Sequence, residues 1–267
     1  MCDCNKRLAA LQLAFIAQKK RQRNCLPSAT ITYRIGFLRK ARIQNMSNNG
    51  KQFRGVNALI FDLDGTLIDS KLDLALSMNA TLEYLGRKAM DHDQIFSYVG
   101  NGVPVLIKRA LGEPTSEEEI EKGIVHFLDY YRSHMLDNTL PYPGVREALD
   151  ALGGRSLAVL TNKPVKFSQA IINGLHMNKY FRFVYGGNSF EKKKPDPTGL
   201  NTLLREFGAA PREAMMVGDS DVDIQTARNA GTWACGVTYG MGSAKLPACG
   251  PDLLLDNLAD LPACLQK

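Results

Sequence analysis

The feature that most limits the fold of this chain is a series of short apolar runs, each closed by a polar or Gly-containing turn. Such runs, rich in β-branched and aromatic residues, are typical of strands buried in a sheet. Five are present, at residues 56–61, 156–160, 183–185, 214–217 and 232–237. Segments with helical apolar spacing lie among them, at residues 145–152, 166–175, 198–207 and 221–230. This alternation predicts a Rossmann-like, doubly wound α/β fold, with a mostly parallel sheet covered by helices on both faces.

The interval between the first two predicted strands is longer than the others and has a different pattern. Apolar residues follow helical spacing from Leu74 to Leu85 and from Ile120 to Tyr131, with little sign of strands. We therefore predict an all-helical cap domain at residues 71–140, inserted into an α/β core made of residues 55–70 and 141–267. Because ligands of open parallel sheets bind beyond the carboxyl ends of the strands, this insertion would emerge beside the site and cover it.

Basic residues are concentrated at the N-terminal end of the chain. Residues 1–54 hold twelve Lys and Arg against one acid, a net charge of +11, so the remaining residues carry −5 of the total of +6. The predicted folded part thus has no basic excess, and we expect no nucleic-acid partner. We interpret residues 1–54 as a basic N-terminal extension, either disordered or non-native, with translation starting at Met46. An organelle transit peptide is the alternative that fits this acid-poor composition.

Cysteine use and hydropathy indicate a cytoplasmic protein. The six Cys include no paired C-x-x-C arrangement, which fits reduced thiols in a cytosol better than a disulfide framework or a zinc site. No run approaches the ~20 consecutive apolar residues that a membrane-spanning helix needs, so we expect no membrane partner. The chain is expected to be a monomer or a homodimer.

Two carboxylates follow the first predicted strand. Asp62 and Asp64 would point to the same side if the strand continued through them. Carboxylates crowded together repel each other unless a cation or a proton offsets their charge, which favours a divalent metal. An ordinary Asp-rich turn before Gly65 is the alternative interpretation.

The later strand ends carry complementary groups. Thr161 and Asn162 offer a hydroxyl and an amide, and Lys194 offers a positive charge; Asp219 and Asp223 add further carboxylates. In phosphoryl transfer a carboxylate can attack phosphorus, donors and a cation offset charge on the phosphoryl oxygens, and an acid protonates the leaving oxygen.

In this order the residues resemble the haloacid dehalogenase superfamily, whose members are mainly phosphatases with an aspartate nucleophile. The resemblance implies Asp62 as nucleophile and Mg²⁺ ligand, and Asp64 as general acid and base with its backbone carbonyl on the metal. It further implies that Asp219 binds Mg²⁺, and that Asp223 supports a metal-bound water or orients Lys194. The implied phosphoryl-binding residues are Thr161, Asn162 and Lys194. The aspartate at position 64 argues against the dehalogenase branch, which lacks it.

Further phrases, at residues 142–145 and 161–164, resemble the phosphoglycolate phosphatases of that superfamily. The expected substrate is therefore a small phosphorylated metabolite, 2-phosphoglycolate, whose carboxylate would face Asn101 and Gly102 in the cap, with Arg109 as a further anion contact. The motifs leave open a sugar-phosphate or nucleotide phosphatase, a pyrophosphatase or a hexose-phosphate mutase. A non-catalytic protein that binds a phosphorylated metabolite is the alternative from a different class.

Overall fold

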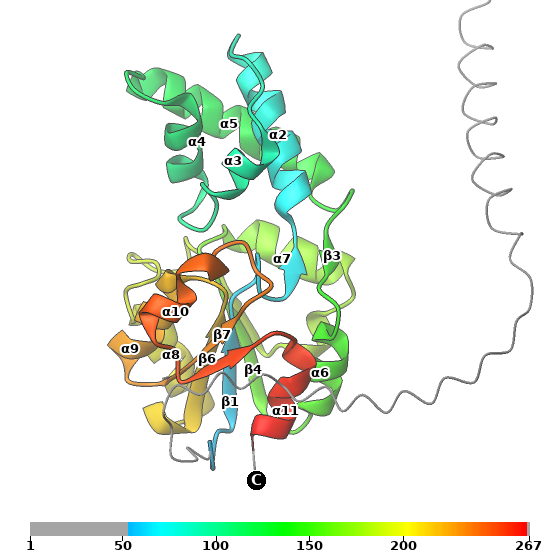
Figure 1. Cartoon of the computed structure of the whole chain (residues 1–267), viewed down its shortest axis with the longest axis vertical. Helices are drawn as coiled ribbons and strands as arrows, with labels where there is room; N and C mark the ends of the chain where they lie inside the picture. The colour runs from blue at the N-terminus through cyan, green and yellow to red at the C-terminus, as the bar shows by residue number, and fades with distance from the viewer. Residues whose placement is uncertain (1–52, 266–267) are drawn as a thin grey trace, which may run out of the picture. The chain divides into compact units, whose positions relative to one another are not determined.

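The computed structural model describes residues 53–265, and a six-stranded parallel sheet lies at the centre of the α/β core (Figure 1). The strand order is β5-β4-β1-β6-β7-β8, and each neighbouring pair is parallel. The predicted Rossmann-like class is confirmed, and all five predicted strands are present. The sixth, β8, lies at the edge and was not predicted. The strands are β1 (Ala58–Phe61), β4 (Ser156–Leu160), β5 (Phe183–Tyr185), β6 (Ala214–Gly218), β7 (Trp233–Val237) and β8 (Leu253–Leu255).

Helices cover both faces of this sheet. Alternate residues of β1 show the division: Leu59 and Phe61 pack into one apolar cluster, whereas Ala58 and Ile60 pack into the other. The first cluster includes residues of α6, α7 and α11, and the second includes residues of α8, α9 and α10. Burial on both faces explains why the strands are apolar throughout rather than alternating. The helices are α6 (Val145–Ala151), α7 (Val165–Gly174), α8 (Thr198–Phe207), α9 (Asp221–Ala230), α10 (Leu246–Cys249) and α11 (Leu261–Cys264), with 3₁₀ turns η1 (Asn178–Tyr180), η2 (Pro211–Glu213), η3 (Ser243–Lys245) and η4 (Leu258–Asp260).

The insertion after β1 is helical, as expected. Its longest helix, α5, begins after the N-cap Ser116, whose hydroxyl accepts a hydrogen bond from Glu119 N. Three acidic residues in the first turn stabilise this end of the helix by their interaction with its dipole. Gly123 lets α4 approach this helix closely, because a Cβ there would lie 2.9 Å from Ile107 Cγ2. The cap helices are α2 (Lys71–Tyr84), α3 (His92–Phe96), α4 (Val103–Leu111) and α5 (Glu117–His134).

A short antiparallel pair, β2 (Ile68–Asp69) and β3 (Leu140–Pro141), forms where the chain leaves and re-enters the core. Asp73, which is buried in the first turn of α2, ties the two connections together. Its carboxylate accepts hydrogen bonds from Thr139 N at 2.8 Å and from Asn138 Nδ2 at 2.8 Å. Both ends of the cap are thus joined at its base.

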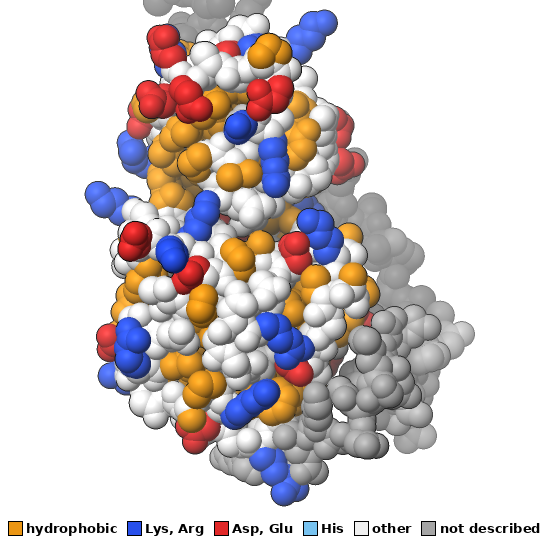
Figure 2. Space-filling model, turned by 90° about the vertical axis from the view of Figure 1, so that its left-hand side faces the viewer, with side chains coloured by type: hydrophobic (Ala, Val, Ile, Leu, Met, Phe, Trp, Pro, Cys, Tyr) orange, Lys and Arg blue, Asp and Glu red, His pale blue; other side chains and the backbone are white. Residues whose placement is uncertain are grey.

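Met46 and residues 1–52 of the predicted extension lie outside the described range, whereas residues 53 and 54 lie within it. Phe53, the first described residue, is buried and packs edge-to-face against Trp233 with ring centroids 5.1 Å apart. None of the helices within residues 53–265 is long and apolar enough to cross a membrane. On the face shown in Figure 2, acidic and basic side chains are interspersed, so this face carries no continuous basic patch.

Candidate active site

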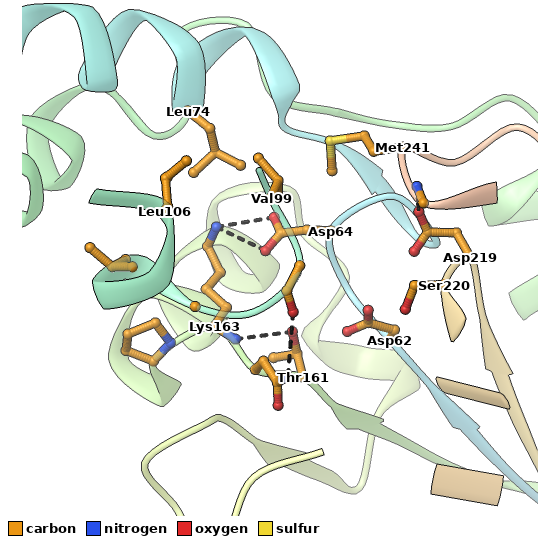
Figure 3. A pocket seen from close by; sticks show the side chains of 16 residues that line it. Asp62, Asp64, Leu74, Val99, Leu106, Thr161, Lys163, Asp219, Ser220 and Met241 are labelled. Atoms are coloured by element: carbon orange, nitrogen blue, oxygen red, sulfur yellow. Dashed lines mark hydrogen bonds and ion pairs between the residues drawn. The ribbon is translucent and has the colours of Figure 1, made fainter. Parts of the chain in front are cut away.

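The carboxyl ends of β1, β4 and β6 meet at one edge of the sheet, because these strands are neighbours in parallel register. Asp62 directly follows β1, Thr161 follows β4 and Asp219 follows β6. All three side chains line one pocket (Figure 3). The sheet therefore brings together residues that lie far apart in the sequence.

An acidic cluster in and behind this pocket consists of the partly buried Asp62 and the buried Asp219 and Asp223. Each offers a carboxylate oxygen within 4.8 Å of the others. Burial raises the pKa of Asp62 and of Asp219 above the ordinary range; Lys194 opposes this at Asp62, whereas Asp223 and Asp62 add to it at Asp219. Burial, and at each group the neighbouring carboxylates, thus disfavour the ionised forms of Asp62 and Asp219 unless a cation lies close by.

Lys194 is the cation that neutralises part of this charge. Its Nζ lies 2.6 Å from Asp223 Oδ1 and 3.0 Å from Asp62 Oδ1. Burial alone would lower the pKa of Lys194, but Asp223 and Asp62 hold it above its ordinary value, so the side chain stays charged. Asp219 forms no ion pair within residues 53–265; it accepts hydrogen bonds from Gly242 N at 2.8 Å and Thr66 Oγ1 at 3.4 Å. A set of buried oxygen ligands with one lysine suits a divalent cation such as Mg²⁺.

Asp223 is fixed by the first turn of α9. Its second oxygen accepts hydrogen bonds from Ser220 N at 3.1 Å and Ser220 Oγ at 2.6 Å. Gly218 at the end of β6 makes room for it, since a Cβ there would lie 2.2 Å from Asp223 Cβ. With its carboxylate held in this way, Asp223 orients Lys194 toward Asp62, which supports one of the two roles expected for it.

Gly65 has a matching role on the other side of the cluster. Its φ of +84° is unfavourable for other residues, and a Cβ would lie 2.3 Å from Asp219 Oδ2. The turn after β1 can therefore approach the Asp219 carboxylate only because residue 65 lacks a side chain.

Replacing Gly65 by Ala is expected to displace Asp219 and to lower both stability and activity. Gly86→Ala is the matched control, because Gly86 has φ +70° but a Cβ added there would meet no atom within 4 Å. Backbone strain alone should cost the control about 1–2 kcal/mol, and the steric conflict should cost Gly65→Ala about 1–3 kcal/mol more. Chemical denaturation measures both values, and equal losses would show that the contact with Asp219 has no consequence.

Asp64 also lines the pocket, but its side chain does not join the acidic cluster. Its two oxygens lie 3.0 and 3.1 Å from Lys163 Nζ (Figure 3). Ser70 Oγ donates to Oδ1 at 2.5 Å. Strand β1 ends at Phe61, so Asp64 lies in the turn that follows and not in a continuing strand, but both carboxylates line the same pocket. The two carboxylates contact different lysines.

Asn162 is buried at the predicted place, but its amide is already engaged. Its Nδ2 donates to Lys194 O at 3.1 Å and to Gly100 O at 3.4 Å, whereas its Oδ1 has no hydrogen-bond partner within residues 53–265. The side chain therefore joins the loop that carries Lys194 to the cap. Thr161 retains a hydroxyl that faces the pocket and accepts a hydrogen bond from Lys163 N at 3.3 Å.

The sequence pointed to three cap residues, Asn101, Gly102 and Arg109, and one of them lines the pocket. Gly102 lines it, whereas Asn101 does not; the Asn101 carbonyl accepts a hydrogen bond from Lys193 Nζ at 2.6 Å. Arg109 is exposed, lies outside the lining and donates to Tyr98 O. The cap side of the pocket is formed by Leu74, Val99, Gly100, Gly102, Val103 and Leu106.

Lys163 is the functional candidate that sequence reasoning missed. It is 8% exposed and contacts both Asp64 oxygens, yet in the sequence it stands out only as part of the phrase at residues 161–164. A lysine that directly follows Thr161 and Asn162 at a buried strand end is the signal that could have identified it.

Several known proteins are similar to this chain in sequence or in structure. The sequence profile of the family described as haloacid dehalogenase-like hydrolase matches residues 59–237. The phosphoglycolate phosphatase of Vibrio parahaemolyticus is 40% identical over 217 residues, which cover 77% of this chain and 94% of that protein. The phosphoglycolate phosphatase of Pseudomonas putida is 38% identical over 216 residues, which cover 77% of this chain and 79% of that protein. The crystal structure of a predicted phosphoglycolate phosphatase from Haemophilus somnus has a TM-score of 0.76 at 34% identity, covering 79% of this chain and 99% of that one.

Proposed function

Because the chain belongs to the haloacid dehalogenase-like hydrolase family, we propose that it is a magnesium-dependent phosphatase that hydrolyses 2-phosphoglycolate to glycolate and phosphate. The observation that carries the proposal is the position of Asp62 in the pocket, ion-paired to Lys194 and adjacent to two further buried carboxylates. The names of the relatives at 38–40% identity support the choice of substrate.

The acidic cluster fits a magnesium ion. The carboxylates of Asp62 and Asp219 and the backbone carbonyl of Asp64 would hold it, and its coordination shell would leave places for water and a phosphoryl oxygen. When bound, the ion offsets negative charge on the cluster and on the phosphoryl group.

Asp62 is the nucleophile in this proposal. One of its oxygens attacks phosphorus, the bond between phosphorus and the ester oxygen breaks, and Asp64 gives its proton to the departing oxygen. A water molecule then attacks the phosphorus of the aspartyl phosphate, Asp64 accepts a proton from it, and the Asp62 carboxylate is released together with phosphate. Lys194 and the Thr161 hydroxyl bind non-bridging oxygens, where they offset the developing charge.

The helical insertion, residues 71–140, would act as the cap over this reaction. Its residues Val99 and Leu106 line the same pocket as Asp62 and Thr161. An apolar wall excludes water from the reacting groups and leaves space for a small organic group beyond the phosphate. The proposed partner is thus a small phosphorylated metabolite, and the proposed location is the cytoplasm.

A substrate panel tests the assignment. The full chain with Mg²⁺ is assayed on phosphoglycolate, hexose phosphates, nucleoside monophosphates, pyrophosphate and p-nitrophenyl phosphate. We expect kcat/KM for phosphoglycolate to exceed each of the others by at least about tenfold. Turnover of phosphoglycolate no faster than that of the aryl ester would refute the substrate, and recovery of an isomeric hexose phosphate would identify a mutase instead.

A further inference from the structure

A buried lysine that the proposed reaction does not use holds the acid–base carboxylate. Lys163 Nζ lies 3.0 and 3.1 Å from the two oxygens of Asp64 and 2.8 Å from the Tyr131 hydroxyl oxygen. Because an ammonium group has three donors, these three contacts use its full capacity. Lys163 therefore has no donor left for a substrate anion while it holds Asp64, and its role must be exerted through that residue.

Tyr131 brings the cap into this contact. It lies on α5, is 2% exposed, and packs its ring against Phe167 of α7 in the core, with centroids 5.6 Å apart. Lys163 Nζ also lies 4.6 Å from the Tyr131 ring centroid, within the range of a cation–π interaction. The contact between Lys163 and Tyr131 thus joins the loop after β4 to the last cap helix.

Ser70 holds Asp64 from another direction. It is buried, donates to Asp64 Oδ1 and immediately precedes α2, the first cap helix. Asp64 therefore contacts Lys163 of the core and Ser70, which immediately precedes the cap. Through Lys163 it is also linked to Tyr131, near the end of the cap. Displacement of α5 from the core would separate the Tyr131 hydroxyl from Lys163. Lys163, the partner of Asp64, would then lose one of the contacts that hold it in place.

We propose that Lys163 and Tyr131 are positioning residues for Asp64: Lys163 orients its carboxylate, and Tyr131 couples that orientation to the position of the cap. The inference rests on the proposed function, in which Asp64 transfers the proton to the leaving oxygen. Proton transfer requires the carboxyl group within hydrogen-bond reach of that oxygen, and the contacts with Lys163 and Ser70 restrict the positions that this side chain can take. Efficient transfer is thereby confined to the state in which the cap lies against the core.

The test is the leaving-group dependence of Tyr131→Phe and Lys163→Met in the full chain. Release of the alkoxide of phosphoglycolate needs a proton, whereas p-nitrophenolate leaves without one. In single-turnover reactions with Mg²⁺, glycolate release should slow by about 10- to 100-fold and p-nitrophenolate release by less than about threefold. The ratio of the two rates within one preparation does not depend on the fraction of folded protein, so impaired folding cannot mimic the effect.

Matched controls are Tyr130→Phe, one residue earlier on α5, and Lys166→Met, an exposed lysine on α7. Both should retain the wild-type ratio. If both rates fall equally in Tyr131→Phe and Lys163→Met, or if neither changes, the positioning role is overturned. A wrong substrate assignment shows separately, as poor glycolate release by the wild type, and the best alkyl phosphate of the panel then replaces phosphoglycolate in the same comparison.

Discussion

Replacing Asp62 by Asn should abolish turnover without harming the fold. The amide has nearly the shape of the carboxylate but cannot form the acyl phosphate, so kcat should fall by about 10⁴- to 10⁶-fold. The free energy of unfolding, in contrast, should not fall. The substitution removes one of three crowded carboxylates while Lys194 keeps Asp223 as its partner. In metal-free buffer the free energy of unfolding should stay the same or rise by about 1 kcal/mol.

Initial rates on phosphoglycolate and denaturant unfolding of the same preparation measure both effects. Asp93→Asn is the matched control, since Asp93 is exposed on cap helix α3 and lies outside the pocket lining. Its rate and stability should match those of the wild type. Retention of more than a small percentage of activity by Asp62→Asn would contradict the role of Asp62 as nucleophile.

Replacing Lys194 by Met should damage activity and stability together. Methionine is of similar length but leaves the partly buried Asp62 and the buried Asp223 without their cation. Breaking a buried ion pair by removing one partner costs about 3–5 kcal/mol, and loss of a charge that stabilises the phosphoryl oxygens should lower kcat by about 10³-fold. The contrast with Asp62→Asn is diagnostic, because one variant removes excess negative charge and the other removes the charge that balances it.

Lys192→Met controls for the loss of a lysine from the same loop, because Lys192 is exposed. It should keep wild-type unfolding and activity. Rates measured under conditions in which unfolding curves show Lys194→Met to be native separate the catalytic loss from the loss of folded protein. A Lys194→Met variant as stable as the wild type would show that the acidic cluster does not depend on this lysine.

The sequence predicts the parts of this fold whose pattern is local. Strand β1 is recognisable because all of its residues are buried, and α8 and α9 have the predicted bounds because Gly208 and Gly231 end them in the left-handed conformation. Strand β8 consists of three leucines, Leu253–Leu255, and unlike the equally short β5 it has no β-branched or aromatic residue to separate it from a loop or a helix. The two-residue strands β2 and β3 depend on pairing across the whole cap insertion, which no local pattern reveals.

The site likewise has residues whose positions the sequence predicts and contacts that it does not predict. Asp62, Thr161 and Asp219 could be placed together because parallel strands deliver their carboxyl ends to one edge. The partners of Asn162 and Lys163 could not be predicted, because they depend on contacts with residues far away in sequence. Asn162 donates to the backbone of Lys194, and Lys163 meets Tyr131 on a cap helix whose orientation is set by tertiary packing. Residue type identified the chemistry, but packing decided which donors remain available to a substrate.

The central claim, that the phosphoryl group passes through Asp62, is tested most directly by the stereochemistry at phosphorus. The phosphorothioate analogue of phosphoglycolate, whose phosphorus carries sulfur and two isotopically different non-bridging oxygens, is hydrolysed by the full chain in water of the third stable oxygen isotope. The configuration of the product thiophosphate, which has four different substituents, is then determined. Attack by Asp62 followed by attack of water makes two in-line displacements, so the account predicts net retention of configuration. Inversion would mean that water attacks the substrate in a single step, and it would contradict the aspartyl-phosphate mechanism.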